Sequence, residues 1–151
     1  MGYEKICRRL LEYGILAPSL YNSQPWGFSI DPDRGVIQLE ADPRRGRSRA
    51  LDPKERELYL ALGACLENMV LAGPALGYEV RTLLFPPGAP PQAVARLRLR
   101  ASSEVMPEPL FSSLLVRHSH AGPLAPGSVG EVHLDRLRAI PPFPKGTRCT
   151  W

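Results

Sequence analysis

Hydrophobic and polar residues follow one another along this chain in patterns that predict helices and strands in turn. Between residues 3 and 16, apolar residues recur every three or four positions, while Arg8, Arg9 and Glu12 fall on the opposite side. This spacing predicts an amphipathic helix. Pro18 ends the pattern, because the residue before a proline is disfavoured in the α region. The small and polar residues 19–25 predict a loop.

Four further stretches predict β-strands, namely residues 26–30, 36–41, 79–85 and 94–101. The first two are separated by Asp31 to Gly35, a run of residues that favour tight turns, so we expect a hairpin. Both strand pairs are expected to be antiparallel, because the segments that join them are loops.

Apolar and basic residues alternate in the last of these strands. The two sets are Ala95, Leu97 and Leu99, and Arg96, Arg98 and Arg100. The alternation predicts one buried face and one arginine-rich face. A solvated face is favoured over RNA or DNA binding, because the aromatic residues on which single-stranded bases stack are absent there.

The strongest helix signal lies between residues 54 and 76, where apolar residues occupy nearly every side. Asp52 is expected to cap this helix, with Pro53 at its first position, and Pro74 to kink or end it. A helix that is apolar all round is covered on several sides. We therefore expect it to lie at the centre of the domain and to pack partly against a second copy in a homodimer.

Helices interspersed with antiparallel strand pairs favour the α+β class, and 151 residues suit one domain. Shorter signals predict a helix over residues 109–117, another over 130–140 and a strand over 147–151. Glu67 and Asn68 interrupt the longest apolar stretch, so no membrane span is expected. Residues 1–9 lack the order of a signal peptide, which favours a cytoplasmic protein.

Charge and cysteine content limit the chemistry that the chain can carry. Its net charge is +4, and only three of its 19 basic residues are lysines. The arginine excess fits either an anionic ligand or a codon preference. Cys7, Cys65 and Cys149 form no CxxC pair, so free thiols are expected rather than disulfides or a structural metal site.

Residues 17–26 form the first candidate site, a stiff loop with two prolines, two serines, an asparagine and a glutamine. These side chains can bond phosphate, hydroxyl groups or the edge of a flavin. A structural turn anchored by Trp26 explains the same residues, and the pattern alone leaves both interpretations open.

The second candidate site is the cationic cluster that begins with Arg117, His118 and Ser119 and ends with His120. Such a cluster suits a phosphate group. A metal site is disfavoured, because no Cys, Asp or Glu lies within a few positions to complete it. A solvated turn remains an alternative.

Residues 17–30, APSLYNSQPWGFSI, closely resemble the APSxxNxQPWxF signature of the nitroreductase-like flavoproteins. Three later segments resemble the Acg-type branch, whose members contain two such repeats. They are VIQLEADPRR at 36–45, DPKERE at 52–57 and GACLEN at 63–68. The resemblance covers nearly the whole chain from about Ile6 onward.

The resemblance implies a two-layer α/β sandwich with a mainly antiparallel sheet, which binds FMN at a dimer interface or between two repeats. It points to Pro18, Ser19 and Asn22 as flavin contacts, with Gln24 and Trp26 fixing the loop. It also implies that Arg117, His118 and Ser119 hold the phosphate. Two positions depart from the family pattern, because Ala121 replaces a second arginine and Leu124 an aromatic residue.

The same resemblance implies one nitroreductase-like half-domain over residues 1–151, with 117–151 as the opening of a second repeat. The chain is thus expected to be partial relative to the family, whether as a short form, a degenerate copy or a truncated product. The implied activity is hydride transfer from NAD(P)H through FMN to a small electron-poor acceptor, and no catalytic residue is identified. The alternative is a non-catalytic flavin-binding or dimerisation protein of the same fold.

Overall fold

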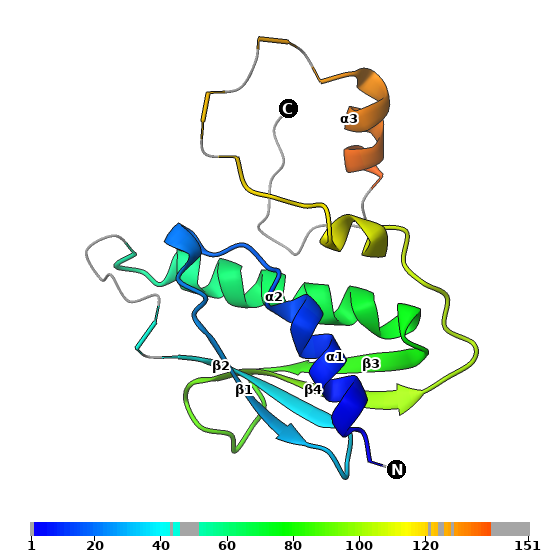
Figure 1. Ribbon diagram of the computed structural model, residues 1–151. Coiled ribbons are helices and arrows are strands. Elements are labelled where there is room, and N and C mark those ends of the chain that lie inside the picture. The colour runs from blue at the N-terminus through cyan, green and yellow to red at the C-terminus, as the bar shows by residue number, and fades with distance from the viewer. Residues whose placement is uncertain are drawn as a thin grey trace. The chain divides into compact units, whose positions relative to one another are not determined.

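A four-stranded antiparallel sheet with helices on one face makes up the body of the protein (Figure 1). The computed structural model describes residues 2–42, 44–45, 52–120, 122–123, 126–127 and 129–139. Contacts within the chain divide it into two units, residues 1–119 and 120–151, and each unit is treated by itself.

The elements follow the predicted order. They are α1 (Glu4–Gly14), the 3-10 helix η1 (Leu20–Asn22), β1 (Trp26–Asp31), β2 (Val36–Ala41), α2 (Arg56–Ala75), β3 (Tyr78–Leu84), β4 (Ala93–Ala101), the 3-10 helix η2 (Phe111–Leu114) and α3 (Glu131–Arg138). The α+β class is confirmed, and every strand pair is antiparallel, as expected.

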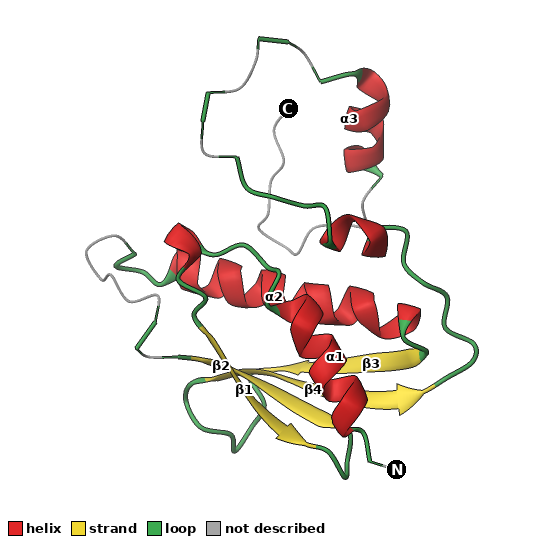
Figure 2. Ribbon diagram, viewed as in Figure 1, coloured by secondary structure: helices red, strands yellow, loops and turns green. Residues whose placement is uncertain are grey.

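The strands lie in the order β1-β2-β4-β3, so β4 pairs with both β2 and β3. Partners in register share a face, which places Leu39 beside Ala95 and Ile37 beside Leu97 under the helices. The alternate positions of β4, with Arg96, lie on the face that no helix of the first unit covers (Figure 2). The predicted alternation of buried and arginine-rich faces is confirmed.

The core lies between this sheet and the two long helices. Leu10 of α1, Leu62 and Met69 of α2 and Leu97 of β4 are fully buried. Cys7 and Cys65 are free and buried among them, as expected, whereas Cys149 lies outside the described residues. Burial raises the pKa of the Cys65 thiol to about 12, so this sulfur stays protonated and unreactive near neutral pH.

Helix α2 begins two residues later than the sequence predicts. Pro53 is not its first residue, because residues 53–54 form a turn and Glu55 has left-handed backbone angles (φ 55°). Asp52 nevertheless caps the helix, since its carboxylate accepts hydrogen bonds from the N–H groups of Arg56 (2.8 Å) and Leu58 (3.0 Å). Pro74 lies in the last turn, so it ends the helix rather than kinking it.

By length and composition, α2 could cross a membrane, a property that the interrupted apolar stretch did not predict. Its packing accounts for part of that composition. Eight of its residues are buried, and the helix contacts α1 and strands β2, β3 and β4. An apolar helix of this kind is the central helix of a packed domain.

The predictions after β4 are less accurate. The helix predicted over residues 109–117 is only the single 3-10 turn η2, which buries Leu114 and brings Phe111 to Tyr13, with ring centroids 5.2 Å apart. Pro109 would stand at the first position of the predicted helix, where proline is tolerated, so missing backbone donors do not explain the shorter turn. Helix α3 falls within the predicted range 130–140, whereas residues 147–151 lie outside the described residues.

Candidate functional site

The loop between α1 and β1 is held in an unusual backbone conformation. Tyr21, Asn22 and Gln24 all have left-handed φ angles, between 49° and 55°. Such angles are uncommon for residues other than glycine and cost free energy unless neighbouring bonds support them. A strained loop of this kind is often found at a functional site.

Hydrogen bonds within the loop supply that support. The Ser19 hydroxyl oxygen accepts the backbone N–H of Gln24 at 2.9 Å, and the Gln24 side-chain amide donates to Asn22 Oδ1 at 3.3 Å. Pro25 and Trp26 are buried at the end of the loop. These contacts agree with the role expected for Gln24 and Trp26. The Ser19 hydroxyl can still donate its proton to a ligand.

The exposed side of the loop is available for binding. Tyr21 keeps 81% of its surface exposed, and the side chains of Pro18 and Asn22 are exposed as well. Pro18, Ser19 and Leu20 line a shallow hollow of about 250 Å³ with Glu57, Leu60 and Ala61 of α2. The capping bonds of Asp52 help to hold the first turn of α2 next to this hollow.

Arg117 reaches the start of the same loop although it lies 101 residues away in sequence. Its Nη2 atom donates a hydrogen bond to the carbonyl oxygen of Leu16 at 2.8 Å, and Nη1 donates to Ser119 Oγ at 3.4 Å. Both acceptors are neutral, so neither cancels the charge of the exposed guanidinium group. The structure therefore brings Arg117 of the second segment to the residue that directly precedes the first segment.

The other predicted site residues make only local contacts. The His118 ring approaches the carbonyl oxygen of Val116 at 3.5 Å, and the His120 ring approaches that of Pro123 at 3.2 Å. Ala121 and Leu124 lie outside the described residues. Over the described ranges, no group of three or more His, Cys, Asp or Glu side chains could hold a metal ion.

Glu57, Leu60 and Ala61 were not predicted as site residues. The only sequence signal for them is the DPKERE segment, in which Glu57 follows the turn at 52–55. Their position beside the loop depends on how α2 crosses the sheet, which no local pattern reveals.

Comparison with known proteins shows what this arrangement resembles. No family model matches the chain. Over 79 residues the chain is 34% identical to a Mycobacterium tuberculosis protein named as an NAD(P)H nitroreductase, found in two strains. That match covers 52% of this chain and 22% of the relative, so the matched part spans about a fifth of the relative's length.

Two solved structures share the architecture at lower sequence identity. One is described as an NADH oxidase from Clostridium acetobutylicum, with a TM-score of 0.52, 17% identity, and 66% of this chain and 77% of that chain covered. The other is described as a nitroreductase from Desulfovibrio desulfuricans in complex with FMN. Its TM-score is 0.51 at 22% identity, and the match covers 77% of this chain and 85% of that chain. The chain has the nitroreductase-like fold. The expected resemblance to that superfamily is confirmed, while the Acg-type branch stays a prediction.

In this nitroreductase-like fold, the loop between α1 and β1 lies against α2 and is reached by Arg117. Arg117 supplies a positive charge, Ser19 and Asn22 supply neutral polar groups, and Leu60 supplies an apolar wall. A ligand with one anionic end and one flat apolar part fits this combination of groups.

Proposed function

We propose that the chain is part of an FMN-dependent oxidoreductase that passes a hydride from NAD(P)H, or a similar donor, to a small electron-poor acceptor. The bond from Arg117 to the Leu16 carbonyl carries this proposal, because it brings one motif-like segment to the residue that directly precedes the other. The flavin in one related structure and the nicotinamide in the names of the relatives agree with it.

The residues present fit an FMN molecule. Arg117 keeps a net positive charge beside neutral partners, so with Ser119 it would hold the phosphate. Asn22 has an exposed amide and Ser19 a hydroxyl that can still donate, so both would meet the polar edge of the ring. Pro18 would form the rim of the flavin-binding hollow, and His118 would lie near Arg117 beside the FMN phosphate.

Bound FMN would supply the hydride chemistry, while the chain binds and orients the cofactor. None of the candidate residues is placed to take up or release a proton with a defined partner. We therefore assign no catalytic residue.

We further propose that a second copy completes the site. A hollow of about 250 Å³ lies below the usual range of roughly 300–1,000 Å³ for small-molecule sites, so this chain would supply one wall. Exposed apolar side chains lie around the hollow and along the adjoining edge of the sheet. They are Tyr59, Leu60, Leu83, Leu84 and Phe85. A homodimer through this surface would bury them and enclose the cofactor.

The tandem arrangement also belongs to this proposal. We infer that residues 1–116 correspond to a first Acg-type repeat and residues 117–151 to the opening of a second. The division of contacts lies three residues later, between Ser119 and His120. A cytoplasmic location suits the proposed donor and the free thiols Cys7 and Cys65.

A non-catalytic flavin-binding or dimerisation protein is the second candidate. It is favoured by Ala121, which occupies the position of the second family arginine. A near-ultraviolet and visible absorbance scan of the purified protein, before and after FMN is added, tests both candidates. The proposed enzyme should show a retained flavin band that NADH or NADPH bleaches without oxygen. A stable band that neither donor bleaches would favour the binding protein, and no retained band would contradict flavin binding.

A further inference from the structure

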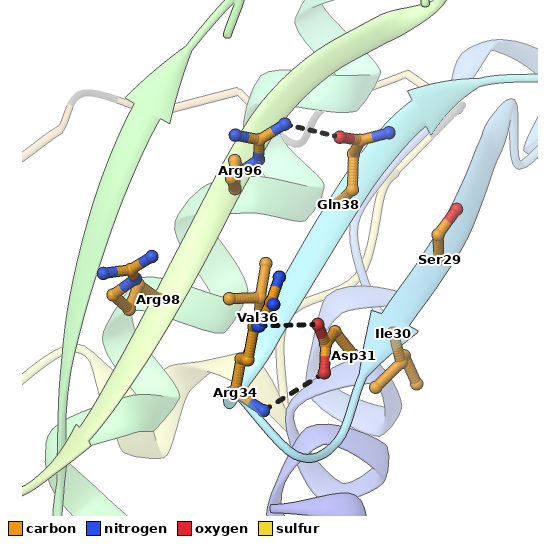
Figure 3. A pocket seen from close by; sticks show the side chains of 8 residues that line it. All are labelled: Ser29, Ile30, Asp31, Arg34, Val36, Gln38, Arg96 and Arg98. Atoms are coloured by element: carbon orange, nitrogen blue, oxygen red, sulfur yellow. Dashed lines mark hydrogen bonds and ion pairs between the residues drawn. The ribbon is translucent and has the colours of Figure 1, made fainter. Parts of the chain in front are cut away.

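The sheet face that the helices leave uncovered carries a cluster of arginine side chains. Arg96, Arg98 and Arg100 occupy alternate positions of β4 on this face, and Arg81 of β3 lies directly opposite Arg98. Arg34 reaches the same face from the turn between β1 and β2. Figure 3 shows Arg34, Arg96 and Arg98 around a hollow on this side.

Two shallow hollows adjoin each other here, with volumes of about 370 and 360 Å³. Arg34 and Arg98 line both. The second hollow is lined by these two residues together with Arg81, Leu99 and Arg100. Each ionisable side chain that lines it is therefore a guanidinium group.

Nearby carboxylates are already engaged with some of these arginines. Glu79 accepts bonds from Arg81 at 2.7 Å and from Arg100 at 2.6 Å, and these two bonds hold its pKa below the usual value. Asp31 lies 3.7 Å from Arg34. Glu79 thus pairs with two arginines, Arg81 and Arg100, while Asp31 makes only a long contact with Arg34.

Arg96 and Arg98 have no carboxylate partner within the described ranges. Arg96 donates to the neutral amide oxygen of Gln38 at 3.3 Å, and Arg98 has no ion-pair partner among the residues described (Figure 3). Like charges directly opposite one another in antiparallel strands are destabilising, and Glu79 offsets only part of this repulsion between Arg81 and Arg98. An anion between these two guanidinium groups would remove that repulsion.

The spacing of the arginines indicates the size of the anion. Alternate residues of a strand lie roughly 6.5–7 Å apart, so one small anion reaches only one or two of these groups. A compact ligand with several linked phosphates reaches Arg98 and its neighbours together, and guanidinium groups bind phosphate through paired hydrogen bonds. No aromatic side chain lines either hollow, which disfavours stacked nucleic-acid bases.

We propose that this open sheet face binds a compact polyphosphate anion, held by Arg98 with Arg34, Arg81 and Arg100 around it. The face lies on the other side of the sheet from the helices and from the loop of residues 17–25. This binding is therefore separate from the proposed flavin site and does not depend on it.

Calorimetric titration of the full chain with tripolyphosphate at low ionic strength tests the proposal. Arg98→Gln should weaken binding by roughly tenfold or more, because charge-assisted hydrogen bonds are lost. Arg8→Gln is the matched control, since Arg8 is an exposed arginine on α1, bound to Glu4 at 2.9 Å on the helical side. Its affinity should equal that of the unsubstituted chain.

A second measurement separates lost binding from lost folding. Without ligand, Arg98→Gln should melt at the same temperature as the unsubstituted chain or higher, because the repulsion with Arg81 is gone. Three results would overturn the proposal. They are no binding of tripolyphosphate, equal weakening by both variants, or tighter Arg98-dependent binding of a single-stranded oligonucleotide or an oligoglutamate peptide.

Discussion

Among single residues, Arg117 matters most for the proposed function, because its side chain brings the second candidate segment to the residue that precedes the first. Its guanidinium group reaches the Leu16 carbonyl while Ser119 occupies a second nitrogen. Its two terminal nitrogens each make one of these bonds, whereas a lysine offers a single nitrogen.

Replacement of Arg117 should therefore weaken FMN binding in a graded way. We expect Arg117→Ala to raise the dissociation constant by roughly tenfold to a hundredfold, because one charge-assisted contact contributes about 1.5–3 kcal/mol. Arg117→Lys should lose less affinity for FMN than Arg117→Ala, since the positive charge remains. Fluorescence titration with FMN measures the effect, with Arg8→Ala as the control. Equal affinity for Arg117→Ala and Arg8→Ala would contradict the assigned role.

Asp52 is a second residue whose role is testable. Its buried carboxylate satisfies the N–H groups of Arg56 and Leu58 at the start of α2. Asp52→Ala should lower the free energy of unfolding by about 1–2 kcal/mol, because these donors lose their partner. Urea denaturation measures this, and Asp33→Ala, an exposed turn residue, should have little effect. If both variants unfold at the same urea concentration, the cap is not a source of stability.

At the scale of elements, the contact between α2 and β3 depends on a glycine. Gly73 is buried in the last turn of α2, and a β-carbon there would overlap Val80 Cγ2 and lie 3.1 Å from the Tyr78 carbonyl oxygen. The helix and the strand that follows it can therefore approach closely only without a side chain at this position.

Two glycine substitutions in one helix test this contact. Gly73→Ala should lower the free energy of unfolding by about 1–3 kcal/mol, because the β-carbon overpacks the interface. Gly63→Ala meets open space, so it should be neutral or raise stability by up to about 1 kcal/mol through better helix propensity. In thermal or urea unfolding, Gly73→Ala should have a lower midpoint than the unsubstituted chain, and Gly63→Ala an equal or higher one. The contact is unimportant if Gly73→Ala is as stable as Gly63→Ala.

For the whole molecule, the exposed apolar surface of α2 and β3 predicts self-association. Tyr59 and Phe85 already pack edge to face there, with ring centroids 6.2 Å apart, and leave their outer sides exposed. A surface of this kind is rare on a monomer unless it binds something.

Sedimentation velocity tests the homodimer. The unsubstituted chain should sediment as a dimer at micromolar concentration and Leu60→Asp as a monomer, because a charge would be buried in the interface. Leu110→Asp is the matched control, since Leu60 and Leu110 are similarly exposed, at 63% and 59%. A monomeric unsubstituted chain, or a dimer that survives Leu60→Asp, would contradict the assigned interface.

The fold was more predictable from the sequence than the site. Alternation in β4 and the apolar spacing of α1 and α2 correctly predicted those elements, because burial of one face imposes a period on the local sequence. The turn at 53–55 was missed, because the left-handed angles of Glu55 leave no compositional signal. Only the single turn η2 forms where a helix was expected at 109–117, because tertiary contacts of Phe111 and Leu114 outweigh a weak helical propensity.

By itself, the sequence determined the α+β class, the order of the elements, the arginine-rich strand face and the motif of residues 17–26. All of these follow from the types of residues and their spacing over short stretches of the chain. Only the tertiary structure decided that Arg117 lies at Leu16, that Glu57 and Leu60 adjoin the loop, and that Arg81 faces Arg98 across two strands. These pairs meet through packing and strand register, which depend on the whole chain and are invisible to any local pattern.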